Sequence, residues 1–419
     1  MKHRLLAALL SAGLLLSLCA CQGPDADPSG DPSASPSASA SADPSASPSA
    51  QEIVADLSQD LPTFSAGLAA DETALTVNGQ EVPADLFSYL LALNCANLEQ
   101  AIYFYGLSGV SVESYADQLL QDSLNAAASY ALLEQKAMEA GCPLTDEQRA
   151  DIQEQMMANG QQAYDNQKQL FGLTDETMEF IFSVDSYYDN LLDSQTSDPT
   201  QAELEQYVSD NGIFGVKHIL LMTVDPEGTP TVQEDGSYAY PALDEATVAE
   251  KKALAEDLLA QLQASDDMET LFDQLMEEYS EDGRNADGTL ASPDGYVYDN
   301  TTSLVDGFRE ATLELEPGEL SGIVETAYGY HILLRLPVDP ENYRDACRQS
   351  AFNALTAQWL EAAEVTPVQA VENLDVADFY ARYNAWQSAM AEQLQAESAD
   401  ASASPDASAQ PSSGDSGNS

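Results

Sequence analysis

Two histidines open two nearly identical apolar segments of this chain. Residues 218–221 read His-Ile-Leu-Leu, and residues 331–334 repeat that tetrapeptide. Short apolar runs of this kind are typical of buried strands, so His218 and His331 are expected on neighbouring strands of one small sheet, where their imidazoles could face each other. Such a pair could hold a polar site in place. It could equally fill a polar hole in a core by hydrogen-bonding to itself.

The same residue types also allow a metal site built from His218, His331 and Asp282. The pattern argues against metal, because the histidines lack close ligand spacing and no fourth donor is evident. We therefore predict neither a metal ion nor another cofactor.

The elements that must position the histidines lie within residues 214–337. A strand at each end of this segment holds one histidine, and helical patterns fill the interval. We therefore predict a small α/β sandwich whose sheet pairs the beginning of the segment with its end. Between the two strands we expect an acidic loop over 225–241, helices over 244–262, 268–279 and 304–313, and a turn at Pro317-Gly318.

Helical patterns also dominate the preceding flank, residues 71–213. It opens with a strand-like piece, Leu75 to Val77, and an Asn78-Gly79 turn. The expected helix starts are Pro83, Tyr115, and two capping boxes, Thr145-x-x-Gln148 and Thr200-x-x-Glu203. One face of the first helix should carry Leu86, Leu90 and Leu93. No chemistry is visible in this flank, and its aromatic and methionine residues are predicted to be core: Tyr103, Phe104, Met156, Met157 and Phe180.

The following flank, residues 338–396, returns to a helical period. Its apolar residues recur at four-residue spacing: Tyr343, Cys347, Ala351, Leu355 and Trp359. Such a stripe needs a partner, and the first flank is the obvious one. We therefore predict an α+β protein in which the small sandwich is inserted into a mainly helical lobe built from both flanks.

Residues 1–20 have the features of a secretory signal peptide. Basic residues precede an apolar run from Leu5 to Leu18, which is too short to span a bilayer comfortably. The run ends in Leu18-Cys19-Ala20-Cys21, which resembles the bacterial lipobox and predicts a lipid chain on Cys21 after cleavage. An ordinary cleavage site after Ala20 is the alternative. A lipid anchor would hold the protein on the outer face of a membrane.

Composition predicts two disordered segments. Residues 23–50 consist mainly of Ser, Ala, Pro and Asp, which cannot bury enough apolar surface to offset the entropy of ordering. We expect a lipidated, disordered tether over residues 21–70. Residues 397–419 have the same composition and should form a disordered acidic tail.

The charge of the chain limits its partners. It contains 14 basic and 71 acidic residues, for a formal net charge of −57. This balance argues against nucleic acid and against direct docking on anionic lipid. Basic peptides fit better, although a solvated acidic surface without a partner is also consistent with it. Cys95, Cys142 and Cys347 lack metal-type spacing, which suggests buried thiols, with one disulfide bridge as the alternative.

Five short motifs occur in a specific order within the inserted segment. They are His218-Ile219-Leu220, Tyr279-Ser280-Glu281-Asp282, Phe308-x-x-Ala311, Gly318-Glu319-Leu320-Ser321 and Val324-x-Thr326-x-x-Gly329-Tyr330-His331-Ile332. In this order and at these separations, they resemble the parvulin-type peptidyl-prolyl isomerase domain. The lipid anchor and helical flanks resemble the PrsA and SurA type of extracytoplasmic foldase, on organisation more than on motifs.

The resemblance implies roles for the residues that match these motifs. His218 and His331 would be the paired histidines under the site, with Thr326 in their hydrogen-bond network and Asp282 at the central polar position. The implied lining of the proline pocket is Leu290, Leu304 and Phe308. The chain departs from the family's Gly-Gly-x-Leu-Gly loop at residues 287–291, Asp-Gly-Thr-Leu-Ala, which suggests a rearranged loop. The loop after the first strand is acidic, so selection of phosphorylated substrates is not expected.

As a function, the resemblance implies a membrane-anchored extracytoplasmic foldase. It would isomerise X-Pro bonds and assist the folding of unfolded or secreted polypeptides. One alternative is a holdase chaperone whose parvulin-type domain is weakly active or inactive. Another is a solute-binding lipoprotein with an unrelated ligand.

Overall fold

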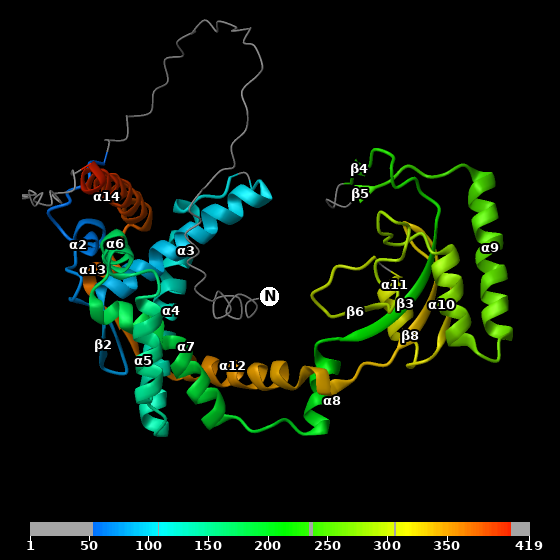
Figure 1. Cartoon of the computed structure of the whole chain (residues 1–419), viewed down its shortest axis with the longest axis horizontal. Coiled ribbons are helices and arrows are strands. Elements are labelled where there is room, and N and C mark those ends of the chain that lie inside the picture. The colour runs from blue at the N-terminus through cyan, green and yellow to red at the C-terminus, as the bar shows by residue number, and fades with distance from the viewer. Residues whose placement is uncertain (1–52, 108, 234–237, 306, 404–419) are drawn as a thin grey trace, which may run out of the picture. The chain divides into compact units, whose positions relative to one another are not determined.

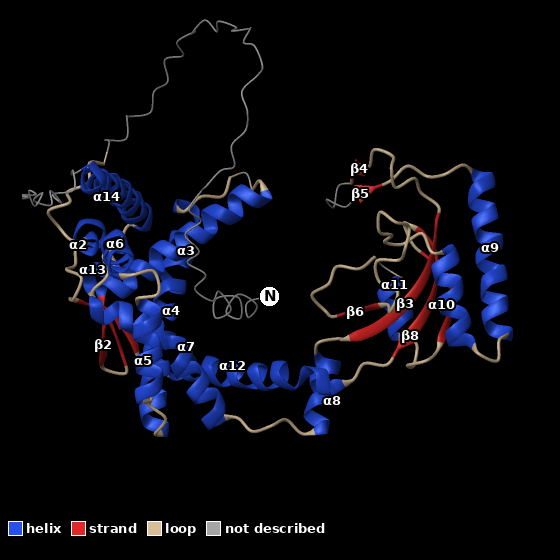
Figure 2. Ribbon diagram, viewed as in Figure 1, coloured by secondary structure: helices blue, strands red, loops and turns tan. Residues whose placement is uncertain are grey.

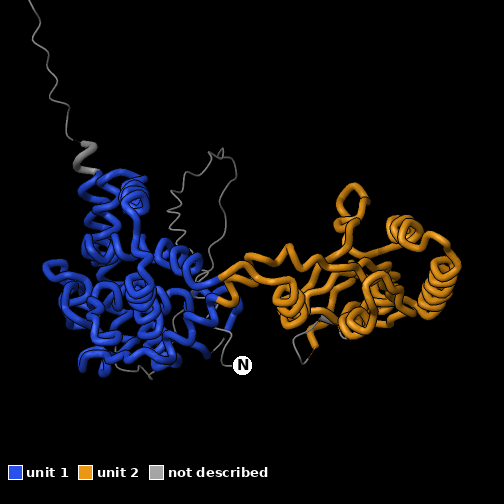
Figure 3. The backbone as a smooth tube through the Cα atoms, turned by 90° about the horizontal axis from the view of Figure 1, so that it is seen from below, with its two compact units in different colours: residues 1–196, 352–419 blue, residues 197–351 orange. Residues whose placement is uncertain are grey.

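The computed structural model describes residues 53–107, 109–233, 238–305 and 307–403. The expected signal peptide, the lipidation site Cys21, most of the tether and the tail beyond residue 403 lie outside these ranges. The chain forms two compact units (Figure 3). One combines residues 1–196 with residues 352–419, and the other comprises residues 197–351. The chain therefore leaves the first unit, completes the second and returns, which confirms the predicted insertion.

The first unit is mainly helical (Figures 1 and 2). Its elements before the insertion are α2 (Leu61–Ala66), β1 (Thr73–Val77), β2 (Gln80–Pro83), α3 (Ala84–Tyr105), η1 (Glu113–Tyr115), α4 (Ala116–Ala140), α5 (Asp146–Met156), α6 (Gln161–Phe171) and α7 (Asp175–Gln195). After it come the second half of α12 (Arg344–Ala362), then β9 (Val365–Pro367), α13 (Gln369–Glu372) and α14 (Val376–Ala403). Helix α4 packs against α3 and α7, and α5 packs against α7.

Both flanks of the insertion share a small sheet in the order β2-β1-β9. Strands β1 and β2 form a hairpin whose two turn residues, Asn78 and Gly79, have φ angles of 52° and 83°. Two positive φ angles are what a two-residue hairpin turn requires, which explains the Asn-Gly pair. Strand β9 pairs antiparallel with the other edge of β1. The return of the chain is therefore fixed by backbone pairing as well as by helix packing.

A buried carboxylate ties the start of α3 to the start of α7. Asp85 is fully buried, and its oxygens accept hydrogen bonds from the Thr174 amide at 2.9 Å, the Thr174 hydroxyl at 2.8 Å, the Thr177 hydroxyl at 2.8 Å and the Leu86 amide at 2.7 Å. These four hydrogen bonds compensate the Asp85 carboxylate for the water contacts that it loses on burial. The negative charge also lies at two helix N-termini, where it is stabilised.

Part of the predicted core is wrong. Met156 is buried and Met157 and Phe180 are partly buried, but Tyr103 is 84% exposed and Phe104 is 69% exposed. Leu93 is exposed too, at 41%. For Tyr103 and Phe104 the physical reason is the length of α3, which extends beyond the helices that cover its first half (Figure 1). An apolar residue in a helix predicts burial only where another element covers it.

The ordered body extends further at both ends than composition predicted. Within the expected tether, Leu61–Ala66 form α2, which Asp60 caps through the Thr63 amide at 2.8 Å. Leu61 is fully buried, and α2 packs on α14. Helix α14 itself continues to Ala403, inside the expected disordered tail. The short apolar cluster around Leu61 supplies the burial energy that the Ser/Ala/Pro-rich part of the tether lacks.

The stripe on α12 does not have the single partner that we predicted. Leu355 and Trp359 pack against the core of the first unit, and Ala351 is exposed. In the second unit, the Tyr343 ring lies 6.4 Å from that of Tyr207, and the Cys347 sulfur lies 3.8 Å from the Glu203 carbonyl. The division between the units falls within α12, so the two halves of this helix belong to different units.

The second unit is an α/β sandwich. Its elements are α8 (Gln201–Asp210), β3 (Phe214–Met222), β4 (Thr231–Val232), β5 (Tyr238–Ala239), α9 (Glu245–Ala264), α10 (Met268–Tyr279), β6 (Tyr296–Tyr298), α11 (Phe308–Leu313), β7 (Leu320–Glu325), β8 (Gly329–Leu336), η2 (Pro340–Tyr343) and the first part of α12. The main sheet has the order β6-β3-β8-β7 and is antiparallel throughout. Strands β3 and β8, from the two ends of the segment, pair with each other as predicted, and they form the centre of the sheet. Strands β6 and β7 are additional edge strands.

The two faces of this sheet bury different cores. Ile219, Leu221 and Ile332 point to α9 and α10. Residues at alternate positions, among them Val216 and Leu333, pack with Phe308 of α11 on the opposite face. Because side chains alternate along a strand, His218 and His331 lie on the α11 face.

Candidate functional site

The histidines meet because β3 and β8 are adjacent. His218 pairs with Leu333, and His331 pairs with Leu220, so the two imidazoles are diagonal neighbours on one face of the sheet. Their Nδ1 atoms lie 3.1 Å apart, and their ring planes differ by 7°. Both side chains are buried. The predicted pair therefore forms in the structure.

A further group lies at each end of the pair. The Nε2 atom of His218 lies 3.0 Å from Oδ2 of Asp282, and the Nε2 atom of His331 lies 2.9 Å from Oγ1 of Thr326. The amide of Tyr328 donates to the same Oγ1 at 3.1 Å. The four predicted polar residues thus form one continuous chain of hydrogen bonds.

Local structure explains why these two end groups are in place. Asp282 follows the end of α10, where the buried Ser280 hydroxyl accepts from the Leu220 amide at 3.2 Å and fixes the loop to β3. Thr326 starts the tight turn between β7 and β8, closed by its amide donating to the Gly329 carbonyl at 2.9 Å. Both end groups are held by backbone geometry at the ends of regular elements.

The carboxylate determines the direction of the hydrogen bonds. An ionised Asp282 can only accept, so Nε2 of His218 carries a proton. If both rings are neutral, Nδ1 of His218 is then an acceptor and Nδ1 of His331 is the donor. Nε2 of His331 in turn accepts from the Thr326 hydroxyl. Each donor and acceptor in the chain is satisfied in this single arrangement.

The electrostatics of the site agree with this arrangement. The hydrogen bond from His218 holds the pKa of Asp282 below its ordinary value. Burial lowers the pKa of His331 to about 3, and the neighbouring His218 ring contributes in the same direction. At neutral pH, His331 is therefore a neutral imidazole and Asp282 an anion.

Sequence reasoning missed Tyr296, which completes the site. Its hydroxyl donates to Oδ2 of Asp282 at 2.7 Å, the same oxygen that His218 contacts. Burial, followed by this hydrogen bond, raises the pKa of Tyr296. Tyr296 and Tyr298 lie on β6, where they pair with Val216 and Phe214 of β3, so both rings face the site. The alternating Tyr-Val-Tyr pattern was the available signal, but a three-residue strand is too short to recognise by period.

An apolar wall stands beside the polar chain. The ring of Phe308 meets both imidazoles nearly edge to face, with centroids 5.1 Å from His218 and 5.4 Å from His331. Leu304 and Tyr298 pack in the same cluster as Phe308. Two of the three predicted pocket residues, Leu304 and Phe308, are therefore brought together.

Leu290 does not join them. It is buried in the other core, with residues of α9 and α10. The loop around it is fixed by Arg284, which donates to the Gly288 carbonyl at 2.6 Å and to the Ser280 carbonyl at 2.9 Å, and by the Ala291 amide, which donates to the Gly283 carbonyl at 2.7 Å. Leu290, in this loop, and Phe308 therefore lie in different cores. The prediction that Leu290 lines the pocket is not supported by this arrangement.

Among the described residues, no group of three or more His, Cys, Asp or Glu side chains is arranged to hold a metal ion. The three described cysteines are unpaired, and only Cys95 is fully buried. No helix in the described ranges combines the length and apolar character needed to cross a membrane.

Residues 218–336 match the family described as Rotamase: PPIC-type PPIASE domain. This segment is a parvulin-type domain. The matched range contains both histidine strands, Asp282, Thr326 and the Phe308 wall, so every group of the site belongs to the parvulin-type domain. Comparison of the whole chain with curated proteins gives no significant match.

Several solved structures match this chain at low identity. The match to a PrsA peptidylprolyl isomerase from Bacillus cereus covers 75% of this chain and 98% of that protein, at 15% identity and a TM-score of 0.30. One of the SurA-like chaperone structures from Campylobacter jejuni, described with PEB4 and Cj1289, matches 70% of this chain and 98% of its own, at 15% identity and a TM-score of 0.20. The PPIase domain of TbPar42 matches 30% of this chain and 99% of its own, at 22% identity and a TM-score of 0.20.

Proposed function

We propose that this protein is a foldase whose parvulin-type domain catalyses the cis/trans isomerisation of X-Pro peptide bonds. The observation that carries the proposal is the series of hydrogen bonds from Thr326 through His331 and His218 to Asp282. This series ends in a carboxylate beside the apolar wall of Phe308. A ring-binding surface and a polar group are the two parts that this reaction needs.

The reaction needs no bond to be broken. Its barrier, about 18–20 kcal/mol, is the loss of amide resonance on rotation, and the uncatalysed reaction takes tens to hundreds of seconds. In the twisted amide the nitrogen is more basic and the carbonyl is less polarised than in the planar amide. Groups that favour this state over the planar one accelerate rotation.

Phe308 and Leu304 hold the proline ring in this proposal. Burial of the ring fixes one side of the rotating bond, while Asp282 places negative charge beside the carbonyl that twists. The histidines do not act as nucleophiles. They fix the position and ionisation of Asp282, and the Tyr296 hydroxyl restricts the same oxygen from the other side.

The first prediction tests the pocket. Phe308→Ala in the full chain should lower the rate of cis/trans exchange in a short X-Pro peptide by about tenfold or more, because about 1.4 kcal/mol or more of ring contact is lost from the transition state. Exchange can be measured by NMR magnetisation transfer. Leu290→Ala is the matched control. It removes an apolar side chain from the other core and should leave exchange per folded molecule unchanged. Equal rates for Phe308→Ala and wild type would exclude this pocket.

A holdase with little turnover is the second candidate. The observation that favours it is the position of Leu290, because the proline pocket then lacks one of the residues that the family supplies. The exchange measurement separates the two. Protection of a denatured client without any acceleration of exchange by the wild-type chain would favour the holdase.

We further propose that the protein acts outside the cytoplasm, held to the membrane by a lipid on Cys21. The sequence Leu18-Cys19-Ala20-Cys21 after an apolar run supports this location. Its clients would be unfolded or secreted polypeptides, as foldase activity requires.

The second prediction tests the anchor. Cys21→Ala should release the protein from isolated membranes or leave it unprocessed, because the acceptor of the lipid is gone. Cys19→Ala, the matched control two residues earlier, should remain membrane-bound. Membrane fractions can be compared by immunoblot after carbonate washing. Equal retention of Cys21→Ala and wild type, with normal processing, would rule out the lipid anchor.

A further inference from the structure

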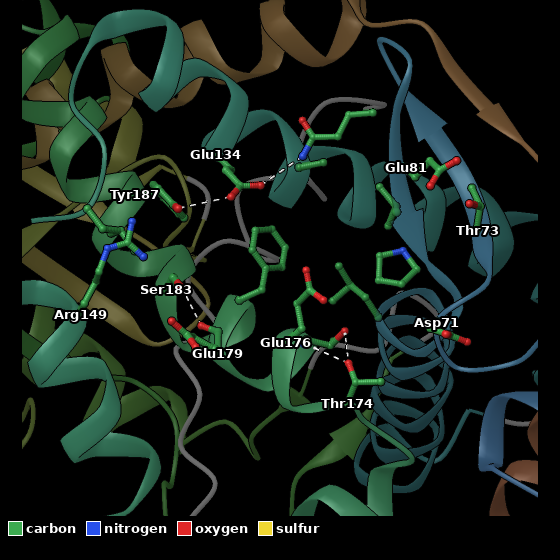
Figure 4. A pocket seen from close by; sticks show the side chains of 18 residues that line it. Asp71, Thr73, Glu81, Glu134, Arg149, Thr174, Glu176, Glu179, Ser183 and Tyr187 are labelled. Atoms are coloured by element: carbon green, nitrogen blue, oxygen red, sulfur yellow. Dashed lines mark hydrogen bonds between the residues drawn. The ribbon is translucent and has the colours of Figure 1, made fainter. Parts of the chain in front are cut away.

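A cavity of about 510 Å³ lies in the first unit and is lined only by residues of that unit. Its walls come from the β1–β2 hairpin on one side and from α4, α5 and α7 on the other (Figure 4). The cluster of His218, His331, Asp282 and Thr326, called the histidine cluster below, contributes no residue to it. The chemistry of the parvulin-type domain therefore leaves this cavity unexplained.

The cavity runs along the edge of a sheet. Four consecutive residues of β2, Gln80 to Pro83, line it. Since successive side chains point to opposite faces of a strand, a surface touched by all four must include the strand's edge. The order β2-β1-β9 makes β2 an edge strand.

The hairpin register shows which backbone groups face the cavity. Val77 and Gln80 flank a two-residue turn and so form a hydrogen-bonded pair, which makes the next pair, Thr76 and Glu81, a pair without mutual hydrogen bonds. The N–H and C=O of Glu81 consequently point away from β1. In the described part of the chain, neither group has a hydrogen-bond partner. Unpaired strand groups of this kind are a template for another extended segment.

The charge around this edge is acidic. The lining includes five carboxylates, from Asp71, Glu81, Glu134, Glu176 and Glu179. Glu134 is half-buried and accepts from the side-chain Nε2 of Gln80 at 3.2 Å and from the Tyr187 hydroxyl at 3.4 Å. No described ion pair neutralises any of the five. The single basic residue, Arg149, lies across the cavity from Glu81 (Figure 4).

We propose that an extended segment of a client polypeptide pairs with the free edge of β2 and places a lysine or arginine side chain among these carboxylates. Backbone pairing would supply affinity for any extended chain, and the acidic cavity would select basic side chains. This inference rests on the proposed function only in that the partner is an unfolded client.

A second copy of this protein is a poorer occupant for the same edge. Pairing of two β2 strands would bring Glu81 and its neighbouring carboxylates against their own copies, and like charges across a strand pair are destabilising. A basic client segment meets the opposite charge. Its capture should therefore weaken as salt is added.

The test uses the full chain and a fluorescein-labelled peptide of alternating threonine and valine with one central lysine and no proline. Fluorescence anisotropy should show binding. Replacement of the lysine by glutamine should weaken it about fivefold to tenfold, the loss expected for one or two partly exposed charge pairs. The double variant Glu134→Gln, Glu176→Gln, which keeps three of the five carboxylates, should prefer the lysine peptide less strongly than wild type does. The matched control Glu154→Gln, Glu392→Gln, which removes two exposed carboxylates outside the cavity, should keep the preference for lysine.

Strand pairing is tested separately from charge. Glu81→Gln keeps the backbone N–H and removes the charge, whereas Glu81→Pro removes both and suits an edge strand. Glu81→Pro should bind less tightly than Glu81→Gln. Because proline could disturb the hairpin, the same comparison is made on wild-type protein with a peptide N-methylated at alternate amides, which should lose binding.

Equal binding of the lysine and glutamine peptides, or full binding of the N-methylated peptide, would overturn the inference, as would dimers that compete with the peptide. The outcomes also separate this inference from the proposed function. Normal X-Pro exchange without peptide binding would exclude the edge site alone. Peptide binding without X-Pro exchange would exclude the isomerase alone.

Discussion

At the scale of single residues, the position of one oxygen matters most. Oδ2 of Asp282 accepts hydrogen bonds from both Nε2 of His218 and the Tyr296 hydroxyl. Two donors on one carboxylate oxygen stabilise the anion and fix its orientation. The negative charge that we assign to catalysis is therefore set by two neighbours, one on a central strand and one on an edge strand.

The third prediction concerns Tyr296. Tyr296→Phe should lower kcat/KM for an X-Pro peptide about tenfold, since a hydrogen bond to a charged group, worth about 1.5 kcal/mol or more, is lost. It should also raise the pKa of Asp282 toward its ordinary value, so that activity declines at a higher pH when the solution is acidified. Kinetics as a function of pH measure both effects.

Tyr298→Phe is the control for this change. It makes the same substitution on the same strand, where the described residues offer no hydrogen-bond partner to the hydroxyl. Its effect on kcat/KM should be much smaller, and its pH profile should match that of wild type. Identical profiles for all three proteins would show that Tyr296 does not act on Asp282.

The fourth prediction is a dependence of stability on pH. In the folded protein His331 stays neutral down to a pKa of about 3, whereas in the unfolded chain it binds a proton below about its ordinary value of 6.5. Between these values the unfolded state holds more protons, so the free energy of unfolding falls as pH falls. Asp282 acts in the same direction, because its stabilisation is present above its ordinary pKa of 3.8 and is lost at lower pH. The slope from one such group approaches about 1.4 kcal/mol per pH unit.

Urea unfolding at several pH values between 7 and 4 measures this slope. His331→Gln cannot take up the proton, so its slope should be smaller than that of wild type, whatever its absolute stability. Parallel curves for the two proteins would contradict the burial of a neutral imidazole at this position.

At the scale of elements, polar side chains at the ends of helices make contacts that fix these ends in place. Asp85 joins the N-termini of α3 and α7, Ser280 joins the end of α10 to β3, and Asp60 caps α2. Helix ends carry unsatisfied backbone groups, so they are natural places for such contacts. Several of these polar contacts join segments that are distant in sequence.

The fifth prediction tests one of these contacts. Asp85→Ala should destabilise the first unit by about 2–3 kcal/mol, because four donors lose their acceptor inside a core. Asp117→Ala, at the exposed start of α4, is the control and should cost about 1 kcal/mol or less. Thermal unfolding followed by circular dichroism compares the two. A similar small loss for both would mean that the buried carboxylate contributes little.

At the scale of the whole molecule, the two sites that we propose lie in different units. The histidine cluster lies entirely in the inserted unit, and the acidic cavity lies entirely in the flanking unit. Each unit has its own core. Variants in one unit should therefore leave the chemistry of the other intact, which is the condition that the peptide-binding and exchange experiments use.

Local pattern was sufficient for much of this architecture. The repeated His-Ile-Leu-Leu segments predicted two paired strands, because strand burial depends on a short apolar run. The Asn78-Gly79 turn and the two threonine capping boxes formed as predicted, since they depend on residues close in sequence. Family-specific motifs located Asp282, Thr326 and Phe308, which the structure brings to the two histidines.

Only the tertiary structure determined the positions of the side chains that follow, because each position depends on which distant element packs against that side chain. Tyr103 and Phe104 look like core residues, but none of the described helices covers the end of α3. Leu61 lies in a segment of tether-like context, yet α14 comes back to bury it. The hydrogen bonds around Arg284 direct Leu290 into the core under α9 and α10, and pairing of β6 with β3 brings Tyr296 to Asp282. None of these outcomes is encoded within a few residues of the side chain concerned; each follows from long-range packing, which a local sequence pattern does not contain.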